Sequence, residues 1–233
     1  MQKTFILVHG AWHGSWCWKY IVPKLRDLGH KVHTPDLIEN QSSFSHIGLK
    51  DYVRNLETVV RNSPSNAILV GHSMAGIVIS QVAENIPEKI ERLIYVAAYI
   101  PEYRGSLIDE EQKSTNSIVP LEAKLDKKTA TIAIKHSAKI RELFYGNCSD
   151  EDFEYAKSNI ADHPFRPFTN KVYLSKENFG SIPKTYIECL QDKAISIDDQ
   201  RRMQSYVKCE VISIDTDHSP FFSAISHLVA AIL

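Results

Sequence analysis

The chain has 233 residues, of which 43% are hydrophobic and 24% charged, proportions typical of one globular domain that can hold an inserted subdomain. Its formal net charge of −1 gives no electrostatic reason to expect a nucleic acid or an acidic membrane as partner. No apolar run approaches the roughly 20 residues that a membrane-crossing helix needs, and the strand-like start at Thr4–Val8 is not expected to belong to a cleaved leader.

Apolar runs alternate with helix-like segments along the chain. The expected strands are Thr4–Val8, Lys31–Thr34, Ala67–Val70, Arg92–Ala97, Lys184–Leu190 and Cys209–Ile214. The expected helices are Trp16–Leu28, Lys50–Asn62, Met74–Asn85, Ile197–Tyr206 and Phe221–Leu233. Strands this apolar, separated by helices, predict an α/β fold with a mostly parallel, doubly wound sheet that is covered on both faces.

The alternation breaks between Pro101 and Ile182. This region is more polar and contains one strand-like stretch, Thr129–Ile134, and one helix-like stretch, Ser149–Asn159. A segment of this length between two core strands is not expected to be a structureless loop. We interpret residues 101–182 as a cap over the carboxyl ends of the strands, inserted between residues 1–100 and 183–233 of the core within a single overall domain.

The most informative motif follows the third expected strand. The apolar run Ile68–Val70 stops at Gly71-His72-Ser73-Met74-Ala75-Gly76 and continues into a helix. A buried strand, a tight turn that holds a serine, and a following helix form a nucleophile elbow, which exposes the serine hydroxyl. The usual pattern, G-x-S-x-G, ends here with Ala75, and because alanine is small we expect a slightly tighter fit. The alternative is an ordinary serine at a helix N-terminus.

A serine nucleophile needs a base, and the base needs an acid to orient it. His218 follows the last expected strand, and Asp192 follows the strand before it, so both should lie at the same sheet edge as Ser73. The competing carboxylates are Asp198, Asp199, Asp215 and Asp217. The first two are explained as charges at a helix N-terminus, and the last two as residues that shape the His218 loop.

A tetrahedral intermediate also needs two hydrogen-bond donors for its oxyanion. We expect one to be the backbone N–H of Met74, directly after the nucleophile. The second is assigned to the backbone N–H of Ala11, because Gly10 and the nearby Gly14 let this loop fold close to the elbow. A plain strand-to-helix turn is the alternative reading of this loop.

Taken together, these features resemble a group of α/β-hydrolases that includes plant methylesterases, hydroxynitrile lyases and bacterial esterases. The similar stretches are Val8–Trp18, Gly29–Val32, Pro35–Leu37, Val70–Gly76, Tyr95–Ala98, Leu143–Tyr145, Tyr186–Cys189, Asp192–Ile195 and Asp217–Phe221. The order serine, aspartate, histidine along the chain is also that of α/β-hydrolases. The resemblance implies Ser73, Asp192 and His218 as the triad, with Ala11 and Met74 as oxyanion donors.

The same resemblance helps to choose between reactions. Hydroxynitrile lyases of this group carry a threonine where Ala11 stands and a lysine where Ser219 stands. Both departures favour ester hydrolysis, so the principal hypothesis is a serine carboxylic-ester hydrolase that forms an acyl-enzyme. Two alternatives are cyanohydrin cleavage by the same residues and a hydrolase-fold receptor that binds a small acyl ligand with vestigial turnover.

The expected substrate is a small apolar or aromatic ester with a small leaving alcohol. The candidate pocket residues are Trp12, Phe144, Tyr145, Phe165 and Phe221. The four cysteines are scattered and form no CxxC pair, so we expect no metal, no cofactor and a cytoplasmic location. A nucleic-acid or membrane partner is not expected, and a homodimer is left open.

Overall fold

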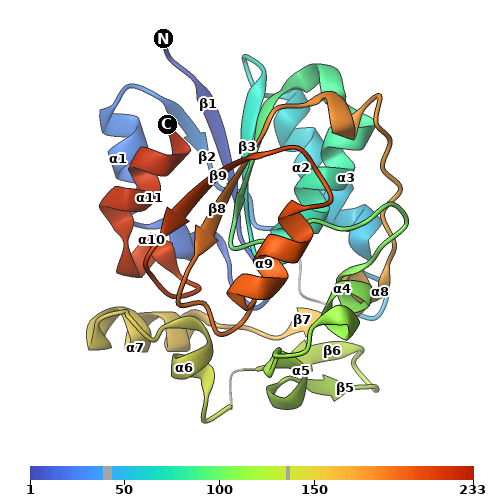
Figure 1. The fold of residues 1–233 in the computed structure, drawn as a ribbon, viewed down its shortest axis with the longest axis vertical. Helices are drawn as coiled ribbons and strands as arrows, with labels where there is room; N and C mark the ends of the chain where they lie inside the picture. The colour runs from blue at the N-terminus through green and yellow to red at the C-terminus, as the bar shows by residue number, and fades with distance from the viewer. Residues whose placement is uncertain (39–43, 135–136) are drawn as a thin grey trace.

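Six strands form one sheet in the order β2-β1-β3-β4-β8-β9 in the computed structural model, which describes residues 1–38, 44–134 and 137–233 (Figure 1). The strands are β1 (Thr4–Val8), β2 (Lys31–His33), β3 (Ala67–His72), β4 (Ile90–Val96), β8 (Lys184–Cys189) and β9 (Glu210–Ile214). Every pairing in this sheet is parallel. The carboxyl ends of all six strands therefore lie at one edge, and the predicted α/β fold is confirmed.

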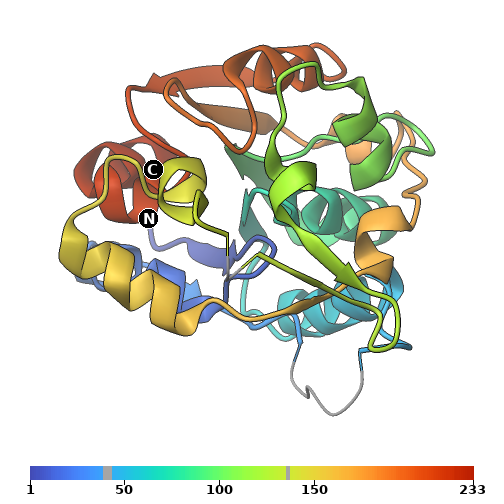
Figure 2. The same cartoon turned by 90° about the horizontal axis from the view of Figure 1, so that it is seen from below.

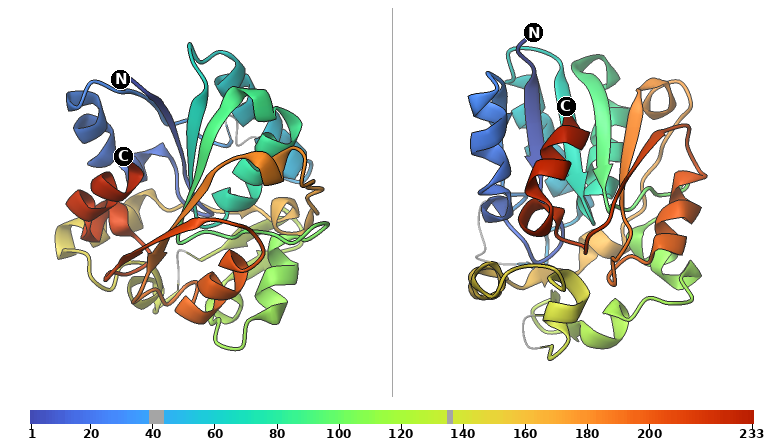
Figure 3. Two further views of the ribbon diagram at one scale, coloured as in Figure 1. Left: turned by 45° about the horizontal axis from the view of Figure 1, so that its top comes forward. Right: turned by 60° about the vertical axis from the view of Figure 1, so that its left-hand side comes forward.

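Helices cover both faces of the sheet, as its uniformly apolar inner strands require. Figures 1 and 3 show α1 (Ile21–Asp27) and α11 (Ile225–Ile232) on one side, with α2 (Leu49–Arg61) and α3 (Ala75–Asn85) on the other. Helix α9 (Ile197–Gln204) packs against β8. Short 3₁₀ turns lie at Ser15–Trp18, Pro87–Lys89 and Phe179–Ser181.

Two expected helices are each divided in the structure. The segment expected at Trp16–Leu28 forms a 3₁₀ turn and then α1, because the ring of Pro23 in the first turn of α1 would clash with the carbonyl of residue 19 in a longer α-helix. The segment expected at Phe221–Leu233 forms α10 (Pro220–Ser223) and α11, with Ala224 in a non-helical conformation between them. The Ser223 hydroxyl bonds to Asp217, which ties α10 to the His218 loop.

The polypeptide between β4 and β8 forms short elements of its own. They are α4 (Leu107–Lys113), α5 (Val119–Glu122), α6 (Ile140–Phe144), α7 (Asp150–Asn159), α8 (Arg166–Thr169), and an antiparallel sheet of β5 (Lys124–Asp126), β6 (Thr131–Ala133) and β7 (His163–Pro164). Figures 1 and 2 show these elements beneath the carboxyl ends of the core strands. The expected strand and helix of this region correspond to β6 and α7. None of the helices within the described ranges is both long and apolar enough to cross a membrane.

Helix α3 approaches the strand-end segment after β4 so closely that only glycine fits at Gly76. A Cβ atom added there would lie 2.2 Å from the carbonyl oxygen of Tyr99, well inside van der Waals contact. We therefore expect Gly76→Ala to lower the free energy of unfolding by about 3 kcal/mol, as in severe overpacking. At Gly146 an added Cβ meets, among the described residues, only the Glu142 carbonyl oxygen at 3.8 Å, which makes Gly146→Ala the control. Urea denaturation measures the free energy of unfolding of each variant. Equal losses in Gly76→Ala and Gly146→Ala would contradict the prediction.

Candidate active site

Ser73 lies in the turn between β3 and α3 with a left-handed backbone, φ 53°. This conformation is strained for a residue with a side chain and is the geometry of a nucleophile elbow. The neighbouring His72 and Met74 are buried, whereas Ser73 is partly exposed. A Cβ atom on Gly10 would lie 2.8 Å from the Cβ of Ser73, so glycine is needed where the β1 loop passes the elbow. The strand, turn and helix predicted around this serine are all present.

His218 and Asp192 form a buried pair. The Nδ1 of His218 donates a hydrogen bond of 2.7 Å to Oδ2 of Asp192, and both side chains are almost completely excluded from solvent. Because the carboxylate can only accept, the proton is placed on Nδ1, which leaves Nε2 as the basic nitrogen. The other carboxylate oxygen, Oδ1, accepts from the backbone N–H groups of Ala194 and Ile195 at 2.7 and 2.9 Å. The turn after β8 thus fixes the orientation of the aspartate, and the aspartate fixes that of the imidazole.

The His218 loop is attached to the elbow. The Nε2 of His72, the residue before Ser73, donates a hydrogen bond of 2.8 Å to the backbone carbonyl of His218. The two imidazole rings lie 4.6 Å apart. The structure therefore holds His218 and Asp192 together at the carboxyl ends of β9 and β8. It bonds the His218 loop to the residue that precedes Ser73 at the end of β3.

The competing carboxylates have other contacts. Asp217 accepts the backbone N–H of Ser219 at 3.1 Å and that of Asn147 at 2.8 Å, so it shapes the loop as expected. Asp199 pairs with Arg202 at 3.0 Å, and Asp215 accepts from the Gln191 side chain at 2.7 Å. Of the five carboxylates considered from the sequence, Asp192 is the one bonded to the His218 ring.

The loop after β1 presents the two expected amides. The N–H groups of Ala11 and Met74 belong to buried residues, and neither is used in a hydrogen bond supplied by the described part of the chain. The carbonyl of Ala11, in contrast, accepts from Nδ1 of His13 at 2.8 Å. An oxyanion bound to Ser73 would offer these N–H groups the acceptor they lack.

Three bonds from a distant part of the chain hold the same loop at Trp12, which has a left-handed φ of 62°. Its backbone N–H donates to Nδ1 of His163 at 3.1 Å, and its indole Nε1 donates to the carbonyl of Ile132 at 2.9 Å. Its carbonyl accepts from the backbone N–H of Ala161 at 3.1 Å. Sequence reasoning did not identify His163, Ala161 or Ile132 at this site, because these contacts span well over a hundred residues and no local pattern marks them.

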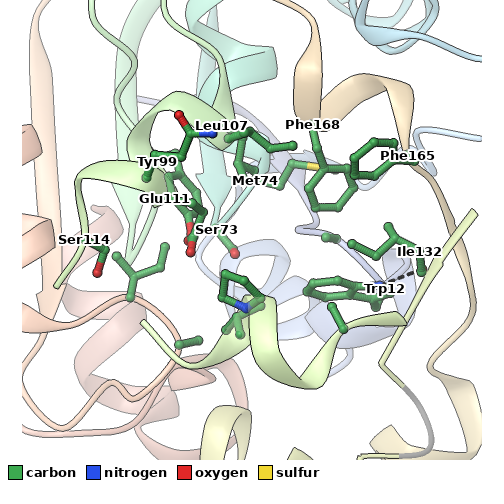
Figure 4. Close-up of a pocket in the computed structure, with 18 of the residues that line it drawn as sticks. Trp12, Ser73, Met74, Tyr99, Leu107, Glu111, Ser114, Ile132, Phe165 and Phe168 are labelled. Carbon is green, nitrogen blue, oxygen red and sulfur yellow. Dashed lines mark hydrogen bonds between the residues drawn. The ribbon is translucent and has the colours of Figure 1, made fainter. Parts of the chain in front are cut away.

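A cavity of about 540 Å³ opens onto Ser73, Met74 and Ala11 (Figure 4). Of the expected pocket residues, Trp12, Phe144 and Phe165 line it, together with Phe168, which was not anticipated. His218 and Asp192 are buried and do not form part of the lining. The cavity is therefore largely apolar next to the candidate nucleophile.

Two of the expected pocket residues lie elsewhere. Tyr145 and Phe221 are fully buried and are not among the residues that line the cavity. The Tyr145 hydroxyl donates to Nε2 of His13 at 2.7 Å, and the Phe221 ring packs against His72 with centroids 5.0 Å apart. Both support the residues behind the site, since aromatic character alone does not reveal which way a ring faces.

The parallel sheet, the elbow serine and the buried histidine–aspartate pair define an α/β-hydrolase. The model of the family described as "Alpha/beta hydrolase family" matches residues 5–232, and the chain belongs to this family. Methylesterase 7 of Arabidopsis thaliana is 32% identical over 248 aligned residues, which cover 100% of this chain and 95% of the relative. Methylesterase 2 of the same plant is 31% identical, with coverage of 95% and 91%.

Solved structures agree with the curated relatives. The crystal structure of polyneuridine aldehyde esterase matches with a TM-score of 0.87 and 25% identity, covering 100% of this chain and 98% of that chain. A pyrethroid hydrolase from Sphingobium faniae JZ-2 matches with a TM-score of 0.88 and 26% identity, with coverage of 100% and 96%. The chain is thus an esterase of the α/β-hydrolase family, a carboxylesterase-type hydrolase, as the sequence predicted.

Proposed function

We propose that this protein hydrolyses small, apolar or aromatic carboxylic esters through a Ser73–His218–Asp192 triad. The observation that carries the proposal is the partly exposed elbow serine, which opens onto an apolar cavity beside the buried histidine–aspartate pair. The esterase names of the relatives and of the structural neighbours support the same reaction class.

In the proposed reaction, Oγ of Ser73 attacks the ester carbonyl carbon while Nε2 of His218 takes the hydroxyl proton. The negative oxygen of the tetrahedral intermediate accepts hydrogen bonds from the N–H groups of Ala11 and Met74. Collapse of this intermediate breaks the bond to the alcohol, which receives the proton from His218. Water, activated by His218 in the same way, then releases the acid from Ser73.

The cavity supports the proposed substrate class. The Trp12 and Phe168 rings lie 5.8 Å apart, Trp12 and Phe144 5.9 Å apart, and Phe165 stacks on Phe168. These rings form an apolar surface for an acyl group, and the plant relatives named methylesterases support a small leaving alcohol such as methanol. Most of the lining residues come from residues 101–182, which supports the proposed role of this segment as a cap.

The lyase alternative finds less support. The residue after His218 is Ser219, a fully buried serine whose hydroxyl has no partner within the described ranges. A cyanide leaving group needs a nearby positive charge, and a neutral serine at this position cannot supply it.

A panel of esters tests the proposal. Methyl and p-nitrophenyl esters of aliphatic and aromatic acids are expected to be hydrolysed, with kcat/KM depending more on the acyl group than on the alcohol. Cyanide release from mandelonitrile should be slower than ester turnover. Faster cyanide release would favour the lyase, whereas tight ligand binding without turnover of any ester would favour a receptor.

A further inference from the structure

The cavity has two chemically different sides. Figure 4 shows Trp12 and Phe165 on one side of Ser73, and Tyr99, Glu111 and Ser114 on the other. An ester bound with its carbonyl at Ser73 must extend away from the nucleophile in two directions. The apolar side suits one half of such an ester. The side formed by Tyr99, Glu111 and Ser114 faces the other half with a carboxylate and two hydroxyl groups.

The hydroxyl protons on this second side are directed at carboxylates of the protein itself. Tyr99 donates its proton to Oε1 of Glu111, and Ser117 donates to Oε2 of the same residue at 2.7 Å. Ser114 donates its proton to Oδ2 of Asp199 at 2.5 Å. The Ser114 oxygen also accepts the backbone N–H groups of Asn116 and Ser117, at 3.3 and 3.0 Å, so both of its lone pairs are used. What Tyr99 and Glu111 still present to a ligand is therefore oxygen lone pairs.

Arg202 acts on Glu111 only from a distance, because its guanidinium contacts other carboxylates. Across the described ranges no lysine, arginine or histidine forms an ion pair with Glu111, and Arg202 is engaged by Glu110 and Asp199 at 2.5 and 3.0 Å. Burial raises the pKa of the Glu111 carboxyl, because desolvation disfavours its charged form. A ligand that brings a hydrogen-bond donor or a positive charge would compensate for this desolvation, whereas a ligand carboxylate would add repulsion.

We propose that Glu111, with Tyr99, makes the site selective for esters that carry a hydrogen-bond donor on the half facing Glu111, either a primary ammonium or a hydroxyl group. The same two residues exclude carboxylates from that half. The exposed Gln112 also lines the cavity and brings its own amide donor, so the selectivity depends on Glu111 and Tyr99 and not on this residue. The inference rests on the proposed function, since it concerns the other half of the same ester.

Binding can be tested separately from hydrolysis. Trp12 lines the cavity, so its fluorescence should report the binding of small probes. We suggest titrating the wild-type protein with 4-butylbenzylamine, 4-butylbenzyl alcohol and 4-butylbenzoate, which differ in the group presented to Glu111. The amine is expected to bind at least about tenfold more tightly than the benzoate, because a hydrogen bond to a charged group changes the dissociation constant by about this factor. The alcohol should also bind more tightly than the benzoate, and its rank against the amine shows how much of the effect is charge.

Glu111→Gln removes the charge but keeps an amide that can still bond Tyr99 and Ser117, so the fold should be retained. This variant should reduce the preference for the amine over the benzoate to about threefold or less. Glu177→Gln, at an exposed glutamate outside the cavity, should leave the preference unchanged. Equal binding of amine and benzoate to the wild-type protein, or a preference that survives Glu111→Gln, would overturn the inference. Loss of ester turnover with the binding preference intact would instead count against the proposed hydrolysis alone.

Discussion

Replacing Ser73 with alanine is expected to lower kcat/KM for a good ester by at least about 10⁴-fold, because the covalent route is lost and only binding and the oxyanion donors remain. The free energy of unfolding should change by less than about 0.5 kcal/mol. Alanine can adopt the left-handed turn at a cost similar to that of serine, and the packing between Gly10 and the elbow is unaffected. Steady-state kinetics and urea denaturation on the same preparation measure both quantities.

The three proposed residues should behave as one unit. His218→Ala should cost nearly as much as Ser73→Ala, and the double variant should show little further loss. Asp192→Asn should also be severe, because an amide in place of the carboxylate favours the wrong tautomer of His218. Asp215→Asn is the matched control, since Asp215 follows the neighbouring strand β9 but, among the residues that the structure describes, bonds only to Gln191. Additive losses in the double variant, or an equal loss in Asp215→Asn, would contradict the assignment.

The second large effect is a loss of stability in mild acid. Burial lowers the pKa of four histidines around the site, to about 3 for His13, and lowers it also for His9, His72 and His163. In the unfolded chain each has a pKa near 6.5, so below that pH the unfolded state binds protons that the folded state does not. Stability is therefore expected to fall as the pH drops below about 6.5, by up to about 1.4 kcal/mol per pH unit for each histidine that stays neutral in the folded state.

Urea denaturation at several values between pH 6.5 and 5 measures this slope before most carboxylates titrate. His163→Asn keeps an acceptor for the Trp12 N–H and should reduce the slope by about 1.4 kcal/mol per pH unit. His227→Asn replaces an exposed histidine and should leave the slope unchanged. A stability that stays constant down to pH 5 would mean that these buried rings are not neutral in the folded state.

The core of the fold was predictable because its signals are local. The apolar run before Ser73 and the small residues around it predict strand, turn and helix within a dozen residues, and β3, the elbow and α3 follow that prediction. His218 and Asp192 were found by one further rule, that the carboxyl ends of parallel strands meet at one edge. Their hydrogen bond of 2.7 Å agrees with that reasoning.

The segment between β4 and β8 was less predictable because its elements are short. Strands of two or three residues, such as β5 and β7, and one-turn helices such as α8 leave almost no periodicity to detect. The bond between Trp12 and His163 joins segments 151 residues apart, and the lining role of Glu111 depends on which face of α4 meets the cavity. Neither feature is encoded in a local pattern.

Covalent labelling tests the central claim most directly. A phosphonate ester that mimics the tetrahedral intermediate should react with the wild-type protein at one site per chain, and mass spectrometry of the digested protein should find the label on the peptide that contains Ser73. His218→Ala should react at least about 10²-fold more slowly, because the hydroxyl then has no base to take its proton. A label at any other residue, or a rate that does not depend on His218, would contradict the account.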